Sequence, residues 1–193
     1  MKVKAKPKKL FFAIIIFLIS AAAFYGLALL FWNIKPVKTV YYKGIAFTFR
    51  ENVKDAEKIP AYPSEDSVGS IFWDYKIKTI VIMFKPDNAS MGYYQANAFE
   101  LTYKLTQIYA TLRPLIIEKN FTAEAIESYN NITREEGKLK VILIPPTFAN
   151  ETSVKLGGNR VIISGKNYRD FDLAVIKTIL CVMKHRGNYT YVG

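Results

Sequence analysis

Few side chains in this sequence have the types and spacing needed for catalysis. The chain has one cysteine, Cys181, and one histidine, His185. A single cysteine cannot cycle between dithiol and disulfide, and a zinc site needs several cysteine or histidine ligands. Cys181 lies in an apolar run, where burial makes a thiol inert. His185 is expected at the end of a helix, where it interacts with the helix dipole. We therefore predict neither a redox site nor a zinc site.

The acidic residues do not form a catalytic pair in the sequence either. Asp170 and Asp172 have the D-x-D spacing of some metal sites, but we expect them in the first turn of a helix, where negative charge is stabilising. The acidic pairs at 65–66 and 135–136 are adjacent in the chain, so they are not a facing acid and base. The sequence has no G-x-x-x-x-G-K phosphate loop. We predict no catalytic, cofactor-binding or metal-binding residue and no cofactor, and so a protein that is not an enzyme.

The distribution of charge argues against a nucleic-acid partner. The formal net charge is +11, from 27 basic and 16 acidic residues. Five of the lysines fall within residues 1–9, and the 22 basic residues that remain leave a net charge of +6 on the rest of the chain. Those charges alternate in sign, as on a solvated surface. No basic stripe carries the stacking aromatic residues that single-stranded nucleic acids need.

An apolar segment near the N-terminus predicts a membrane anchor. Residues 10–32 contain no charge and no proline, and as a helix they would be about 34 Å long, enough to span a bilayer. The lysines that precede them place the N-terminus in the cytoplasm. A cleaved signal peptide is the alternative, with Ala21–Ala23 as the cleavage region, but the apolar run continues well past it. We expect a cytoplasmic tail at 1–9, an uncleaved signal anchor at 10–34 and an extracytoplasmic domain at 35–193.

One face of the predicted anchor carries small residues. Ala22 and Gly26 lie one helical turn apart, with Ala23 beside them. Small residues at this spacing let a second membrane helix approach closely. Because alanine and glycine are also common in membrane helices generally, a plain tether is the alternative.

The sequence contains more N-glycosylation sequons than chance would give. With 11 asparagines and 20 serines and threonines in 193 residues, about one sequon is expected by chance. There are five, and all follow the predicted anchor, which favours an outer domain that carries N-glycans. Without disulfides, and with a composition suggestive of a thermophile, the chain fits an archaeal cell surface. The candidate sites are Asn88, Asn120, Asn131, Asn150 and Asn188.

Hydrophobic periodicity predicts an α/β fold for this outer domain. Apolar runs at 79–84 and 139–144 indicate buried strands. The 3-4 spacing over 91–112 indicates an amphipathic helix. Gly-Gly-Asn between 153–156 and 160–164 indicates a β-hairpin. The other predicted elements are two short strands in 37–50, a helix at 51–58, a brief helix that begins after Ser64, a strand at 115–118, a helix at 122–129 and a last helix at 170–185.

From residue 79 onward, the predicted element order resembles a thioredoxin-like domain: strand, helix, strand, helix, β-hairpin and final helix. The closest local likeness is 153–166 with the helix that contains Phe171. The family's Cys-x-x-Cys would follow Phe84, where this chain has no cysteine, and Thr152 occupies the place of the family's cis-proline. The resemblance therefore implies a domain without redox chemistry. In that family such domains serve as binding or scaffold modules, sometimes within membrane complexes.

Taken together, these features predict a non-enzymatic, single-pass membrane accessory protein. Its outer domain would bind a partner protein in a larger membrane, secretion, glycosylation or cell-surface assembly, and its other partners would be the lipid bilayer and N-glycans. Two alternatives stay open. One is a glycan-processing enzyme, with two carboxylates about 5–10 Å apart in a deep pocket, and the other is a membrane-anchored small-molecule receptor. Tyrosines that could supply an interaction surface are Tyr41, Tyr42, Tyr93, Tyr94, Tyr103 and Tyr109.

Overall fold

Six strands assemble into one mixed sheet in the computed structural model, which describes residues 37–85, 91–111, 119–130 and 132–192. The sheet order is β3-β7-β8-β6-β4-β5. Neighbouring strands are parallel except for the hairpin of β7 and β8. The strands are β3 (Ala61–Tyr62), β4 (Thr79–Phe84), β5 (Asn120–Ala125), β6 (Lys138–Ile144), β7 (Ser153–Leu156) and β8 (Arg160–Ser164). The prediction of a mixed α/β domain is confirmed.

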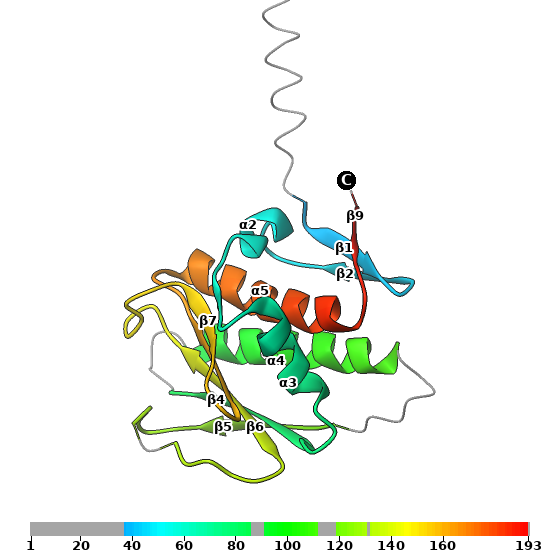
Figure 1. Cartoon of the computed structure of the whole chain (residues 1–193). Coiled ribbons are helices and arrows are strands. Elements are labelled where there is room, and N and C mark those ends of the chain that lie inside the picture. The colour runs from blue at the N-terminus through cyan, green and yellow to red at the C-terminus, as the bar shows by residue number, and fades with distance from the viewer. Residues whose placement is uncertain (1–36, 86–90, 112–118, 131, 193) are drawn as a thin grey trace, which may run out of the picture. The chain divides into compact units, whose positions relative to one another are not determined.

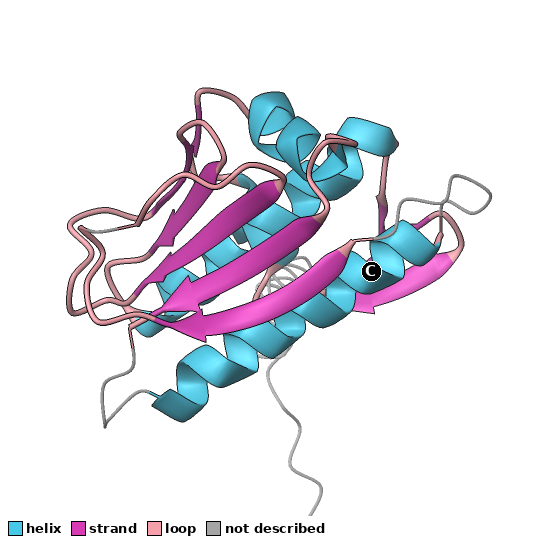
Figure 2. Cartoon of the chain, turned by 90° about the horizontal axis from the view of Figure 1, so that it is seen from below, coloured by secondary structure: helices cyan, strands magenta, loops and turns pink. Residues whose placement is uncertain are grey.

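Three helices cover one face of this sheet (Figure 1). They are α3 (Glu65–Trp73), α4 (Met91–Ala110) and α5 (Tyr168–Arg186). Asn167 caps α5, since its side chain accepts a hydrogen bond from the backbone N–H of Asp170. Seen from below, the opposite face of the sheet has no described helix across it (Figure 2).

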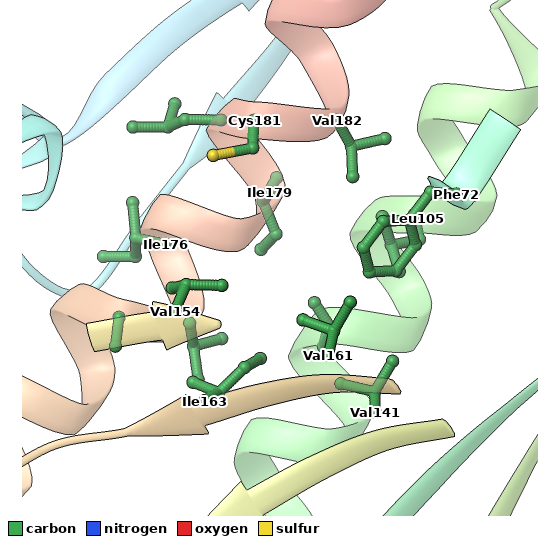
Figure 3. Packing of buried hydrophobic residues seen from close by; sticks show 14 of the residues in the cluster. Phe72, Leu105, Val141, Val154, Val161, Ile163, Ile176, Ile179, Cys181 and Val182 are labelled. Carbon is green, nitrogen blue, oxygen red and sulfur yellow. The ribbon is translucent and has the colours of Figure 1, made fainter. Parts of the chain in front are cut away.

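The main hydrophobic core lies between the helices and the sheet. Val141, Val161 and Ile163 project from the strands toward Leu105 of α4 and Ile179 of α5 (Figure 3). All five side chains are fully buried. The apolar runs of β4 and β6 therefore reflect strands in the middle of a sheet, where both neighbours and one helical layer exclude water.

A second, smaller sheet lies on the far side of the helices (Figure 1). Its order is β2-β1-β9, and all its pairings are antiparallel. The turn between β1 and β2 uses Lys43 and Gly44, with φ of 48° and 84°, which is the backbone conformation that a tight hairpin requires. The elements of this layer are β1 (Thr39–Tyr42), β2 (Ile45–Thr48), the short helix α2 (Val53–Glu57) and the C-terminal β9 (Thr190–Val192).

One predicted element is wrong. The helix expected at 122–129 is instead strand β5, which pairs in parallel with β4 from Asn120↔Thr79 to Ala125↔Phe84. Its alanine and glutamate residues favour a helix locally, but the exposed backbone edge of β4 offers six residues of ladder, and this tertiary pairing decides the conformation. No helix lies between β5 and β6 among the described residues. The thioredoxin-like element order has a helix there, so the resemblance stays a prediction.

The predicted strand at 115–118 and the predicted anchor at 10–34 lie outside the described residues. Among the residues that the structure does describe, no helix is long and apolar enough to span a bilayer. By its internal contacts, Pro36–Gly193 forms one compact unit.

Candidate interaction surface

The only cysteine is a core residue. Cys181 lies on α5 with 1% of its surface exposed. Burial raises the pKa of its thiol to about 12, so the reactive thiolate is not populated at neutral pH. Its backbone carbonyl lies at a close crossing of α3 and α5, because a Cβ added to Gly69 would lie 2.2 Å from that oxygen. The thiol is part of a helix crossing, where it has no access to a substrate.

The charged residues near the end of α5 join two helices. His185 Nδ1 lies 2.7 Å from Asp66 Oδ1 on α3. Lys177, 2% exposed, donates to the carboxylate of Glu65, and Lys184 donates to the other oxygen of Glu65 at 2.8 Å. The arrangement fixes α3 to α5, and each of its acids is paired with a base of α5.

The two aspartates of the D-x-D sequence do not converge on one point. Asp170 accepts hydrogen bonds from Thr152 Oγ1 at 3.1 Å and from Asn167 Nδ2 at 3.0 Å. Asp172 instead accepts from the Tyr93 hydroxyl at 2.5 Å. Among the described residues, no group of three or more histidine, cysteine, aspartate or glutamate side chains could hold a metal ion.

Two carboxylates do line one small space between α4 and α5. Asp172 and Glu100 lie there with Arg50 and Asn97, but the space leaves no room for a water-sized sphere. Glu100 is also engaged by Lys104 at 2.7 Å, whose ammonium donates to the backbone carbonyl of Thr48. Glycoside hydrolysis needs room for a sugar and a water between its carboxylates. This pair therefore does not form a substrate site.

The Tyr93 hydroxyl joins α4 to the N-terminal part of α5 through Tyr168 and Asp172. The Tyr93 oxygen lies 2.7 Å from the carbonyl oxygen of Tyr168 and 2.5 Å from Asp172 Oδ1. The hydroxyl is therefore placed between two acceptors, the carboxylate of Asp172 and the backbone carbonyl of Tyr168. Burial raises the pKa of Asp172 above its usual value.

The carboxyl ends of the parallel strands are the usual ligand site of open α/β sheets, at the point where the strand order reverses. Here that point falls between β4 and β6. The Tyr129 hydroxyl closes part of it, since it donates to the carbonyl of Leu143 at 2.9 Å and accepts from the backbone N–H of Lys85 at 3.3 Å. Residues 86–90, which follow β4, lie outside the described residues, and the described part presents no catalytic group.

The outer edge of β5 is the most prominent open feature of the sheet. Asn120 and Ile126 donate their backbone N–H groups to Lys78 and Phe84, at 2.9 Å each. Because backbone direction alternates along a strand, residues 120, 122, 124 and 126 bond to β4, and Phe121, Ala123 and Ala125 direct their N–H and C=O groups away from the sheet. In the described part of the chain no strand pairs with this side. The edge is a template for another strand.

An apolar groove between α4 and β5, the α4 groove, runs beside this edge. Its volume is about 360 Å³, and the eight residues that line it carry no charge. Phe84, Phe121, Ala98 and Ala123 supply most of its apolar lining, together with Phe99. On its rim Phe99 of α4 is 70% exposed and stacks on Tyr103, with ring centroids 5.9 Å apart and planes 9° apart. Large aromatic rings exposed beside small apolar residues are characteristic of binding surfaces.

The two edge strands of the six-stranded sheet differ in length and in composition. At one edge β3 has two residues, flanked in the sequence by Pro60 and Pro63, which blunt that edge because proline cannot donate to a new ladder. At the other edge β5 has six residues. It contains no proline or lysine and only one charge, Glu124. Natural proteins guard long edge strands unless the edge has a partner, so the β5 edge with the α4 groove is the candidate interaction surface.

The structure places only some of the residues predicted from sequence. Asn120, Asn150 and Asn188 are exposed, as glycan acceptors must be. Asn120 begins β5 and its side chain lies on the sheet face opposite α4, since even-numbered residues of β5 alternate with Phe121. The remaining predicted residues lie outside the described part of the chain: Asn88, Asn131, Ala22, Ala23 and Gly26.

The tyrosines expected at an interaction surface divide into two groups. Tyr41 and Tyr103 are about half exposed, at 48% and 52%, and Tyr93 is half-buried. The other three, Tyr42, Tyr94 and Tyr109, are buried in the core.

Sequence reasoning missed Phe99 and the β5 edge. The signal for Phe99 was present, because it lies four residues before Tyr103 on the polar side of an amphipathic helix. No local signal could show that 120–125 is an edge strand. Comparison of the chain with protein-family models, with curated proteins and with solved structures found no match in any of the three.

Proposed function

We propose that this chain is a membrane-anchored, non-enzymatic accessory protein whose α/β domain binds a partner protein through the β5 edge and the α4 groove. The observation that supports this most directly is the unguarded edge beside an exposed, stacked aromatic pair. An incoming strand would bond to the backbone of Phe121, Ala123 and Ala125, and its side chains would enter the uncharged groove. This is strand addition, in which backbone bonds give affinity and pockets select side chains.

The membrane part of this proposal comes from the sequence. Residues 10–34 are predicted to form the anchor, with N-terminal lysines on the cytoplasmic side and sequons on the outer side. A protein held at a membrane needs no tight affinity for a neighbour in the same membrane. The Asp172 and Glu100 carboxylates do not support the glycan-processing alternative, because they enclose no space for a substrate.

Site-specific photo-crosslinking in native membranes tests the proposal. A photoreactive amino acid replaces Phe99 in the full-length protein, and a matched variant carries it at Tyr62, a 49% exposed aromatic residue on the opposite sheet edge. We expect a discrete crosslinked protein band from position 99 and none from position 62. If position 99 yields no adduct, or if both positions yield the same adducts, the β5 and α4 surface does not bind a partner and the proposal fails.

A further inference from the structure

We propose that the partner of the β5 edge is a second copy of this chain, joined through antiparallel pairing of β5 with β5 about a two-fold axis. This rests on the proposed function, because it assigns an occupant to the same surface. The result would be one continuous twelve-stranded sheet, with α4 of each copy beside the junction. Two-fold pairing is the commonest arrangement of homodimers, and it requires a surface that is complementary to itself.

The sequence of β5 meets that requirement in one register. If Ala123 is opposite Ala123 of the second copy, Phe121 is opposite Ala125 of the second copy, so all three outward-facing residues are paired. Each aromatic ring then lies beside a methyl group, and the smallest residues meet on the axis. On the other sheet face Thr122 is opposite Glu124 of the second copy, which avoids two like charges in direct opposition.

Electrostatics favour this face for contact between identical copies. The chain beyond the first nine residues carries a net charge of +6, so two copies repel each other over most of their surface. The eight residues that line the α4 groove are uncharged, and the edge strand adds only Glu124. Copies of a basic domain approach with least repulsion where neither presents a cation.

The layer order also fits two anchored copies. A two-fold axis that continues an antiparallel sheet is perpendicular to that sheet, so both copies keep their helices on the same side of it. Val37, the first described residue, leads into β1, which lies beyond the helices from the six-stranded sheet (Figure 1). Strand β1 of both copies would therefore lie on the same side of the joined sheet. This two-fold arrangement therefore gives both domains the same facing, as two copies anchored in one membrane require.

Cysteine crosslinking in native membranes tests the register. In a hydrogen-bonded antiparallel pair the Cα atoms are about 5.5 Å apart, which a disulfide can bridge. Ala123→Cys in the full-length protein should therefore give a covalent dimer under mild oxidation on a non-reducing gel. The matched control is Ala125→Cys, equally exposed and on the same face of β5, but about 14 Å from its own counterpart in this register. Cys181 is 1% exposed and should not react.

We expect at least roughly ten-fold more dimer from Ala123→Cys than from Ala125→Cys, given the reach of a disulfide. Equal yields would indicate random collision and would overturn the inference, as would the absence of dimer at both positions. The same experiment separates the inference from the proposed function. If Ala123→Cys forms no dimer while the photoreactive group at position 99 still captures a different protein, the second copy is the wrong occupant and partner binding stands. If neither reagent forms an adduct, both proposals fail.

Discussion

Replacing Gly69 with alanine should destabilise the domain strongly, because two helix backbones meet at this residue. A Cβ at position 69 would lie 2.2 Å from the carbonyl oxygen of Cys181 and 2.9 Å from its carbonyl carbon. Normal carbon-to-oxygen contacts are about 3.3 Å or longer. The helices α3 and α5 must therefore separate by about 1 Å, and the obstructing atoms belong to a hydrogen-bonded backbone that cannot rotate away.

The expected change in the free energy of unfolding follows from the contacts that are disturbed when α3 moves away from α5. Alanine alone would favour the helix by about 1 kcal/mol relative to glycine. Overpacking of a tight core costs about 1–3 kcal/mol and occasionally more. Movement of α3 also weakens the buried bond from Trp73 Nε1 to the carbonyl of Val182, 3.0 Å long, which adds about 1 kcal/mol. We expect a net loss of about 1–3 kcal/mol in the free energy of unfolding, or a fall in Tm of roughly 2–12 °C.

Urea unfolding of the full-length protein in detergent, followed by circular dichroism, measures this loss. Gly92→Ala is the matched control. Gly92 is exposed in the first turn of α4 and has no atom within 4 Å of the added Cβ, so alanine there should be neutral or stabilise by up to about 1 kcal/mol. If Gly69→Ala were as stable as wild type while Gly92→Ala behaved as expected, the close crossing of α3 and α5 would be refuted.

Two further predictions concern buried charge. Glu65→Gln should lower the free energy of unfolding by about 2 kcal/mol, because it leaves the buried ammonium of Lys177 without a carboxylate. Lys184→Met removes the exposed partner of Glu65 and should cost less than about 1 kcal/mol. Equal losses in urea unfolding would contradict the greater weight given to the buried Lys177–Glu65 pair. Asp172→Asn should become more stable relative to wild type as pH rises from about 4 to 7. The pKa of Asp172 is higher in the folded state than in the unfolded state, so wild type loses stability as this carboxyl group ionises, and the asparagine variant does not. Urea unfolding across that range would show the opposite trend if Tyr93 stabilised an ionised Asp172.

Elements with a strong hydrophobic period could be predicted from sequence. The apolar runs of β4 and β6 and the 3-4 spacing of α4 identify their own conformation, because burial requires those patterns. The hairpin of β7 and β8 follows from its glycines in the same way. These predictions depend on residues close together in the chain, and they are the ones that the structure confirms.

The candidate surface could not be predicted in this way, because it depends on partners distant in sequence. Residues 122–125 include alanine and glutamate, which favour a helix, yet β4 offers an edge that only the folded sheet creates. Whether β5 then ends the sheet depends on the position of every other strand. A two-residue strand such as β3 carries no local pattern, so the contrast between a blunted edge and an open edge is a property of the assembled sheet.

The predicted anchor would raise the local concentration of the domain, and this concentration decides whether two β5 edges pair. A pairing worth about 4 kcal/mol has a Kd near 1 mM and would be almost undetectable among dilute soluble domains. Proteins tethered close together experience effective concentrations of roughly that size, so two anchored copies could pair through β5 although free domains would not. The same reasoning explains why a six-residue edge with a single charge need not cause aggregation, because one two-fold partner occupies it and leaves the blunted β3 edge as the free edge of each copy's six-stranded sheet. Removal of the anchor should therefore abolish the Ala123→Cys dimer at low protein concentration and leave the fold of 37–192 unchanged.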